Sequence, residues 1–247
     1  MIVEQRDEHV AIIGLNDPAK RNALSIAMFD ALEAALDRIR ADDSIRALLI
    51  RGEGPAFCAG FDLQAVVEQP SLMAEFIHRL SRLIRGLRRL PVPVVASVHG
   101  AAIAGGCAIL SACDFVIIAR DARVGYPVHR IGVSPAVTLP TLLQAVAPGA
   151  ARALVMSGDL IDGAESQRIG LASHLAPEAA SAHRDALALA QLLASRPPHA
   201  MRITKHWLNE IDGSLDDSRF DDVANGSASP TWSAEAISRL REVWRTR

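Results

Sequence analysis

The strongest constraint on the fold is an order of elements that occurs twice in the first half of the chain. An apolar run is followed by a turn of glycines and other small residues, and the turn leads into a helix-like segment. The two turns are FCAGFDL, residues 57–63, and HGAAIAGG, residues 99–106. Because parallel strands need a crossover between them, strands that alternate with helices predict a largely parallel sheet. The sequence is therefore typical of an α/β protein.

Further segments extend this pattern. Two β-branched runs, at 2–5 and 10–15, are split by three charged residues and predict a hairpin. Ser25 is a suitable N-cap for an amphipathic helix, since apolar residues recur at helical spacing from Met28 to Ile39. Beyond about Leu139 the pattern predicts mostly helix. The remaining predicted elements are strands at 47–50, 94–98, 115–119 and 171–175, a helix at 72–87 and a small-residue helix ending near 112.

Composition excludes several classes of protein. Half of the 247 residues are hydrophobic, which is enough to bury a large core. The net charge of −2 gives no reason to expect nucleic acid or a membrane surface as a partner. The three cysteines, Cys58, Cys107 and Cys113, form no C-x-x-C pair and predict buried, reduced thiols in a cytoplasmic protein. We find no signal-peptide pattern and no apolar run of about 18 residues.

Three familiar motifs are approached but not matched. Gly100, Gly105 and Gly106 are spaced like the start of a phosphate-binding loop, but the Lys-Ser/Thr that ends such a loop is absent, since Gly106 is followed by Cys107. The G-x-G-x-x-G pattern of dinucleotide-binding domains is absent. The segment around Ser134 resembles a nucleophile elbow, but Pro135 removes the backbone N–H that an oxyanion hole there would use. We therefore interpret Ser134 as a loop or capping serine.

Four segments in this order resemble the crotonase superfamily, the enoyl-CoA hydratases and isomerases. They are RNAL at 21–24, the two glycine turns, and the run from Cys113 to Gly132. The resemblance reaches to about Lys205 and is only loose beyond it. It implies an α/β crotonase-like ββα spiral core over 1–196 and a helical region over 197–247. It also implies a homotrimer or a dimer of trimers in fatty-acyl-CoA metabolism.

The resemblance implies an acyl-CoA thioester as ligand, with coenzyme A as part of the substrate and no separate cofactor or metal. The thioester oxygen would lie between the backbone N–H groups of Phe61 and Gly105. When an enolate forms at the α carbon, its charge falls on this oxygen, and loss of one such donor typically costs about 3 kcal/mol. The positions expected to bind coenzyme A are Arg21, Ala23, Leu24, Ala59, Asp62 and Leu63.

The departures from the family pattern concern the acid and base. Hydratases of the family add water with two glutamates, whose positions here are Ala108 and Val128, and a third carboxylate position falls near Ala136. A positioned acid or base contributes about 10²- to 10⁴-fold each. Two hypotheses remain open. The protein either binds acyl-CoA without ordinary hydratase activity, or catalyses related chemistry through an atypical base such as His129.

Several side chains near these motifs have two interpretations each. If residues 126–130 are extended, His129 faces away from Val128, which disfavours a catalytic role. Asp62 could bind substrate or cap the next helix. Tyr126 could donate into a pocket or only pack. Lys20 and Arg130 could reach phosphates or remain solvated. The amphipathic segment 234–244 could dock on its own chain or contact another subunit.

Overall fold

A computed structural model describes residues 1–229 and 234–245. Its strands are β1 (Ile2–Asp7), β2 (Val10–Leu15), β3 (Ala47–Gly52), β4 (Val94–Val98), β5 (Ala101–Ile103), β6 (Phe115–Ala119), β7 (Arg123–Gly125), β8 (Leu160–Ile161) and β9 (His174–Ala176). Its helices are α1 (Ile26–Ala41), α2 (Leu63–Glu68), α3 (Leu72–Arg88), α4 (Gly105–Ala112), α5 (Leu139–Ala145), α6 (Pro148–Ser157), α7 (Gly163–Arg168), α8 (Ala179–Ala194), α9 (Pro198–Ile211), α10 (Asp217–Ala228) and α11 (Ala234–Arg245). Three short 3₁₀ helices complete the list: η1 (Pro18–Lys20), η2 (Pro127–Ile131) and η3 (Ala136–Thr138).

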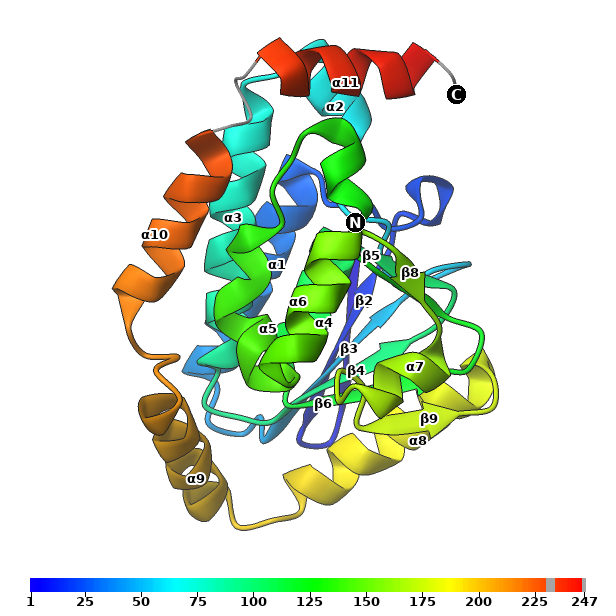
Figure 1. Ribbon diagram of the computed structural model, residues 1–247. Coiled ribbons are helices and arrows are strands. Elements are labelled where there is room, and N and C mark those ends of the chain that lie inside the picture. Colours follow the sequence, from blue (N-terminus) through cyan, green and yellow to red (C-terminus); the bar gives the residue numbers. More distant parts are fainter. Residues whose placement is uncertain (230–233, 246–247) are drawn as a thin grey trace.

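The main sheet has the strand order β1-β2-β3-β4-β6-β9 (Figure 1). Strands β1 and β2 form the predicted antiparallel hairpin, and all other neighbours in this sheet are parallel. Strand β3 and its neighbours β2 and β4 are almost wholly buried, as expected for parallel strands covered on both faces. The prediction of a parallel α/β sheet is confirmed.

A second, small sheet was not predicted. Its order is β5-β7-β8, and β5 lies inside the second glycine turn. Strands of two or three residues are too short to show a hydrophobic period. The predicted strand at 171–175 is displaced, since β9 covers His174–Ala176. Leu171 and Ala172 are buried in the turn that follows α7, so burial rather than strand pairing explains their apolar character.

The predicted N-terminal helices are present. Ser25 caps α1, because its hydroxyl accepts a hydrogen bond from the backbone N–H of Met28 at 3.2 Å. Helix α3 packs against α1, α4 and α10, and α8 packs against β3, β4 and β6 (Figure 1). In the part of the chain that the structure describes, no helix has both the length and the apolar character needed to cross a bilayer.

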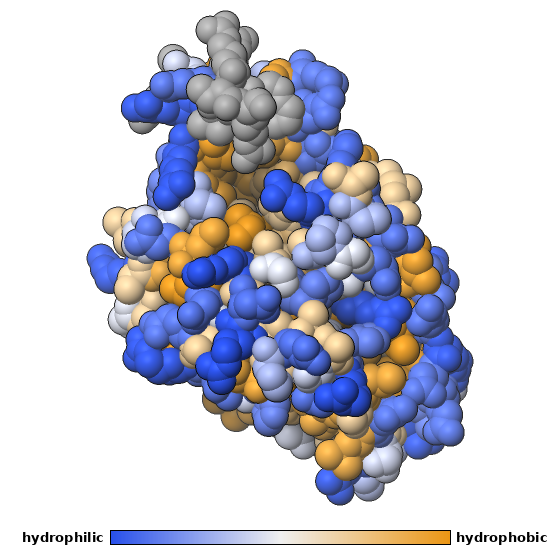
Figure 2. Space-filling model, turned by 90° about the vertical axis from the view of Figure 1, so that its right-hand side faces the viewer, coloured by the Kyte–Doolittle hydropathy of each residue, from blue (hydrophilic) through white to orange (hydrophobic). Residues whose placement is uncertain are grey.

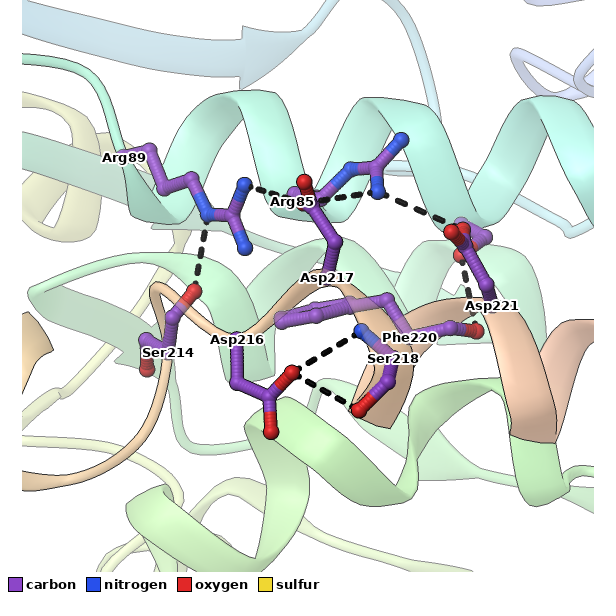
Figure 3. A network of polar contacts seen from close by, with 9 residues as sticks. Arg85, Arg89, Ser214, Asp216, Asp217, Ser218, Phe220 and Asp221 are labelled. Carbon is purple, nitrogen blue, oxygen red and sulfur yellow. Dashed lines mark hydrogen bonds and ion pairs between the residues drawn. The ribbon is translucent and has the colours of Figure 1, made fainter.

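Helix α10 lies along α3 and is held by arginines. Arg85 and Arg89 both contact Asp217, at 3.0 and 2.6 Å, and Arg85 also reaches Asp221 (Figure 3). The Arg89 guanidinium lies 5.4 Å from the centre of the Phe220 ring, which is fully buried. An apolar anchor and a set of ion pairs thus join α10 to α3.

Helix α9 is held by polar groups, while its large apolar side chains face outward. The buried Lys205 ammonium donates to Asp114 Oδ2 at 2.6 Å and to the Val92 carbonyl at 2.9 Å. The Asn209 amide donates to the Arg88 carbonyl at 3.0 Å. Burial lowers the pKa of Lys205 from its ordinary value. The exposed apolar side chains of α9 are Ile203, Trp207, Leu208 and Ile211.

Helix α11 docks on its own chain, against η2 and α2 (Figure 1). Ala236 packs directly on Gly132, and a Cβ atom at Gly132 would lie 2.7 Å from the Ala236 Cα. Gly132 also has a φ of +71°, which favours glycine. The docking alternative is the one that the structure shows.

Helix α8 is tied to the end of β3 through a histidine. Arg51 Nη1 lies 2.6 Å from His183 Nε2, so the guanidinium donates and the neutral imidazole accepts. Arg51 Nε also donates to Glu53 at 2.8 Å. The pKa of His183 is lowered, mainly by burial and next by the positive charge of Arg51. Of the smaller effects, the charge of Glu53 raises this pKa and that of His99 lowers it.

We expect Lys205→Met to lower the free energy of unfolding by about 3 kcal/mol, because Asp114 would keep its charge without its partner. Urea denaturation measures this change. The control is Arg38→Met, since Arg38 and Glu4 form an ion pair between exposed side chains and such pairs are worth at most about 1 kcal/mol. Equal losses in the two variants would contradict the assignment.

We also expect acid to destabilise the protein through His183. The folded pKa lies below the unfolded value of about 6.5, so the unfolded chain binds more protons in this range. Stability from His183 is complete above the unfolded pKa and is lost as the pH falls toward the folded pKa. Unfolding free energies between about pH 7.5 and 5.5 should decrease less steeply in His183→Gln than in His199→Gln. Identical slopes in both variants would disprove the link.

Candidate functional site

A cavity of about 300 Å³ lies between α3, the two glycine turns and the segment from η2 to η3. Its wall is mainly hydrocarbon, and Figure 2 shows a hollow lined by hydrophobic side chains in the upper part of the face that it presents. Among the described lining residues, none is acidic and Arg130 has the one charged side chain. The residues that carry the argument below are Ala59, Phe61, Leu63, Gly105, Ala108, Tyr126, Val128 and Thr138.

The two glycine turns meet along one wall of this cavity. Cys58 N donates to Ala101 O at 2.9 Å, and Ile103 N donates to Cys58 O at 2.9 Å. Gly60 has a φ of +92°, and a Cβ atom there would lie 3.0 Å from Ile103 O. A Cβ atom at Gly106 would lie 2.4 Å from Cys58 O. The backbones are therefore in direct contact, which explains the small residues of both turns.

The backbone N–H groups of Phe61 and Gly105 belong to these turns. Gly105 is the first residue of α4, where N–H groups have no partner inside the helix. Among the hydrogen bonds of residues 1–229 and 234–245, neither N–H has a protein acceptor. Both residues line the cavity. An unpaired N–H at a helix N-terminus and a second unpaired N–H, on residues that line one cavity, are donors of the kind that stabilise an anion.

Two features explain the shape of the second turn. Ala104 has φ 51° and ψ −107°, an uncommon backbone conformation for a residue with a side chain. Its N–H donates to Gly125 O at 2.8 Å, which ties it to β7. A Cβ atom at Gly105 would lie 2.9 Å from Leu24 Cδ1. Close packing against the end of the Leu24 side chain, in addition to access from the cavity, favours glycine at this position.

The RNAL segment lies against the first turn. The Arg21 carbonyl accepts from Ala59 N at 2.9 Å, and Leu24 N donates to Gly60 O at 2.7 Å. Ala23 and Leu24 are buried, whereas Arg21 is exposed. The sequence interpretation overlooked Asn22, whose side-chain amide donates to Glu53 O and Ala56 O at 2.9 and 2.8 Å. Asn22 has a φ of +57°, a backbone conformation that no pattern in the sequence reveals, and this explains why its role was not predicted.

Asp62 corrects one prediction. It precedes α2, but its carboxylate makes no capping hydrogen bond. Instead it accepts from the Lys20 ammonium at 2.7 Å, and this bond raises the pKa of Lys20. Asp62 is buried and does not contribute to the cavity lining, whereas its neighbours Phe61 and Leu63 do. The pairing of Lys20 with Asp62 replaces the interpretation of Lys20 as simply solvated.

The two positions at which the resemblance implies glutamates in active hydratases lie at the cavity. Ala108, on α4, and Val128, in η2, both contribute to its lining. The third carboxylate position, Ala136, does not, although Pro135 and Val137 do. Ser134 lines the cavity, and its hydroxyl accepts from Ala136 N at 3.2 Å, so it also serves as the predicted loop serine.

His129 does not contribute to the cavity lining. Residues Pro127–Ile131 form a 3₁₀ helix that ends at Gly132 with a φ of +71°, so the condition considered from the sequence, an extended segment 126–130, does not hold. The imidazole of His129 lies beside Gly158, where a Cβ atom would be 3.6 Å from Nδ1. The side chain is exposed. This placement gives no support to a catalytic role.

Four hydroxyl side chains form a buried cluster at the cavity wall. Tyr126 Oη lies 2.9 Å from Thr138 Oγ1, and Ser111 Oγ lies 2.7 Å from Thr141 Oγ1. The pKa of Tyr126 is raised well above its ordinary value, mainly by burial. Burial likewise raises the pKa of Cys58 and Cys107 to about 12, and both thiols are buried and unpaired, as predicted. Within the described residues, no group of three metal-binding side chains occurs.

Comparison with known proteins gives a consistent result. Residues 5–217 match the family model described as enoyl-CoA hydratase/isomerase. Mouse mitochondrial methylglutaconyl-CoA hydratase is 31% identical over 84% of this chain and 68% of its own length. The 2,3-dehydroadipyl-CoA hydratase of Escherichia coli is 31% identical over 85% of this chain and 82% of its own. An enoyl-CoA hydratase/isomerase structure from Xanthobacter autotrophicus has a TM-score of 0.89 at 27% identity, covering 99% of this chain and 93% of that one.

Proposed function

Because this chain belongs to the enoyl-CoA hydratase/isomerase family, we propose that it binds acyl-CoA thioesters and polarises their carbonyl group without ordinary hydratase activity. Members of the family act on CoA substrates and need no further cofactor. The observation that carries the proposal is the lining of the cavity. It contains the Phe61 and Gly105 positions, yet none of its described residues is acidic.

Two backbone N–H groups are the binding part of this proposal. Phe61 and Gly105 would donate to the thioester oxygen, and the α4 N-terminus would favour the negative charge that develops there. The residues around the RNAL segment and Ala59, Asp62 and Leu63 would hold coenzyme A. The exposed Arg21 and the rim residue Arg130 are available for its phosphates.

The described cavity lining lacks a side chain that could act as the acid or base of a hydratase. Ala108 and Val128 cannot exchange a proton or activate water, and no described lining residue supplies a carboxylate in their place. Two lost groups at about 10²-fold or more each would leave hydration of an enoyl thioester very slow. The second candidate is an active hydratase or isomerase in fatty-acyl-CoA metabolism with an atypical acid or base, for which His129 was the sequence-based choice.

The exposed apolar face of α9 supports self-association. Four large apolar side chains of α9 are exposed, and Ile211 is exposed by 82%. We propose that α9 contacts another copy in a homotrimer or a dimer of trimers. We further place the protein in the cytoplasm, since its three cysteines are unpaired.

The first test separates binding from chemistry. Calorimetry with butyryl-CoA should show binding, whereas S-butyl-coenzyme A, which lacks the carbonyl oxygen, should bind about tenfold more weakly because both N–H groups lose their acceptor. Crotonyl-CoA, followed by the absorbance of its conjugated thioester, should be hydrated at least about 10²-fold more slowly than by a family hydratase with both glutamates.

Each other outcome of this test has a defined meaning. Rapid hydration of crotonyl-CoA would overturn the binding-only proposal, and an unchanged rate in His129→Ala would then exclude that residue as the base. Equal affinities for the thioester and the thioether would overturn the oxyanion hole. No binding of either ligand would overturn the assignment as a whole.

The oligomer is tested separately by sedimentation velocity. The wild-type chain should sediment as a trimer or a dimer of trimers, and a double variant, Trp207→Glu with Ile211→Glu, should sediment as a monomer because charge would be buried in the contact. Leu192→Glu, on α8, is the control at another exposed apolar position and should keep the wild-type state. A monomeric wild-type protein at micromolar concentration would contradict this proposal.

A further inference from the structure

The buried hydroxyl cluster lies beside the two positions that have lost their carboxylates. We propose that the hydroxyl pair of Tyr126 and Thr138 hydrogen-bonds an oxygen atom carried by the acyl chain near the thioester. The pair would make the cavity selective for oxygenated acyl groups over plain hydrocarbon ones. This inference rests on the proposed acyl-CoA function and assigns two specificity-determining residues to the same site.

The position of the pair supports this role. Tyr126 and Thr138 both line the cavity, and their exposed fractions are 2% and 1%. Tyr126 directly precedes Pro127 and Val128 in the chain, so its phenol enters the site from the same segment as one vacated glutamate position. Thr138 ends η3, and its hydroxyl lies 2.9 Å from the phenol oxygen.

The cluster behind the pair holds it in place and links it to the other vacated position. Ser111 Oγ donates to the carbonyl of Ala108 at 2.8 Å. Because Ser111 uses its hydrogen there, Thr141 Oγ1 donates to Ser111 Oγ at 2.7 Å, and it also lies 3.1 Å from Thr138 O. All four hydroxyl-bearing side chains are buried. Ala108, Tyr126 and Thr138 all line the same cavity.

One of the two hydroxyl hydrogens of Tyr126 and Thr138 is available to a ligand. Each hydroxyl has one hydrogen and two lone pairs, and the contact between Tyr126 and Thr138 uses one of the two hydrogens. The protein partners for the second are Ser111 Oγ, at a long 3.4 Å from Thr138, and the Cys107 thiol beside Tyr126. Sulfur is a weak acceptor, so a ligand oxygen would accept this hydrogen better.

The surroundings make this hydrogen bond selective. The wall around the pair is hydrocarbon from Met73, Ile77, Leu80, Val133 and Val137. No carboxylate in the described lining competes for the donor. The Tyr126 phenol is in its protonated form at neutral pH, as for an ordinary tyrosine, and burial raises its pKa further. An acyl oxygen elsewhere along this wall would lose its hydration without replacement.

The test compares butyryl-CoA with each enantiomer of 3-hydroxybutyryl-CoA by calorimetry, while absorbance reports any dehydration. In the wild-type protein one enantiomer should bind about tenfold more tightly than butyryl-CoA. Tyr126→Phe should reduce this ratio to about one. Ser134→Ala, which removes a hydroxyl of the lining outside the cluster, should keep the wild-type ratio.

A second pair of variants covers the case in which Tyr126→Phe does not fold. Thr138→Val should lower the ratio, and Thr138→Ser, which keeps the hydroxyl, should restore it. A wild-type ratio of one, or a ratio unaffected in Tyr126→Phe and Thr138→Val, would overturn this inference while leaving acyl-CoA binding in place. If neither ligand bound, the proposed function itself would fail, and this inference with it.

Discussion

The site depends on one constraint, the direct contact between the backbones of two turns that are about forty residues apart. Cys58 exchanges hydrogen bonds with Ala101 and Ile103, and the absence of a Cβ atom at Gly106 lets α4 begin against the Cys58 carbonyl. This contact brings Phe61 and Gly105, the first residue of α4, to one cavity. A side chain on Gly106 would push the turns apart, since backbone atoms cannot give way as a flexible side chain can.

A site built from backbone differs from one built from side chains in how substitution affects it. The N–H groups of Phe61 and Gly105 persist whatever the side chains are, provided that the turns keep their shape. Acid and base groups disappear with single substitutions, as at Ala108 and Val128. In our proposal the chain has kept the first part and lost the second, so that recognition of the thioester is separated from proton transfer.

The sequence predicted the parts of the fold in which many residues share one pattern. The hairpin, α1, α3 and the buried parallel strands are long enough for their hydrophobic period or their capping residue to be seen. The small sheet was missed because its strands have two or three residues. The orientation of His129 was considered for an extended segment 126–130, whereas Pro127 begins a 3₁₀ helix that ends at Gly132. The cluster around Tyr126 was also missed, since its members are spread over thirty residues with no motif.

Helix α3 forms a wall of the cavity on one side and contacts α10 on the other. Much of that second contact consists of arginine–aspartate pairs, in which Asp217 and Asp221 are largely exposed (Figure 3). Dissolved ions screen such pairs far more than they affect apolar packing. Higher ionic strength should therefore weaken the contact between α10 and the face of α3 that lies opposite the cavity.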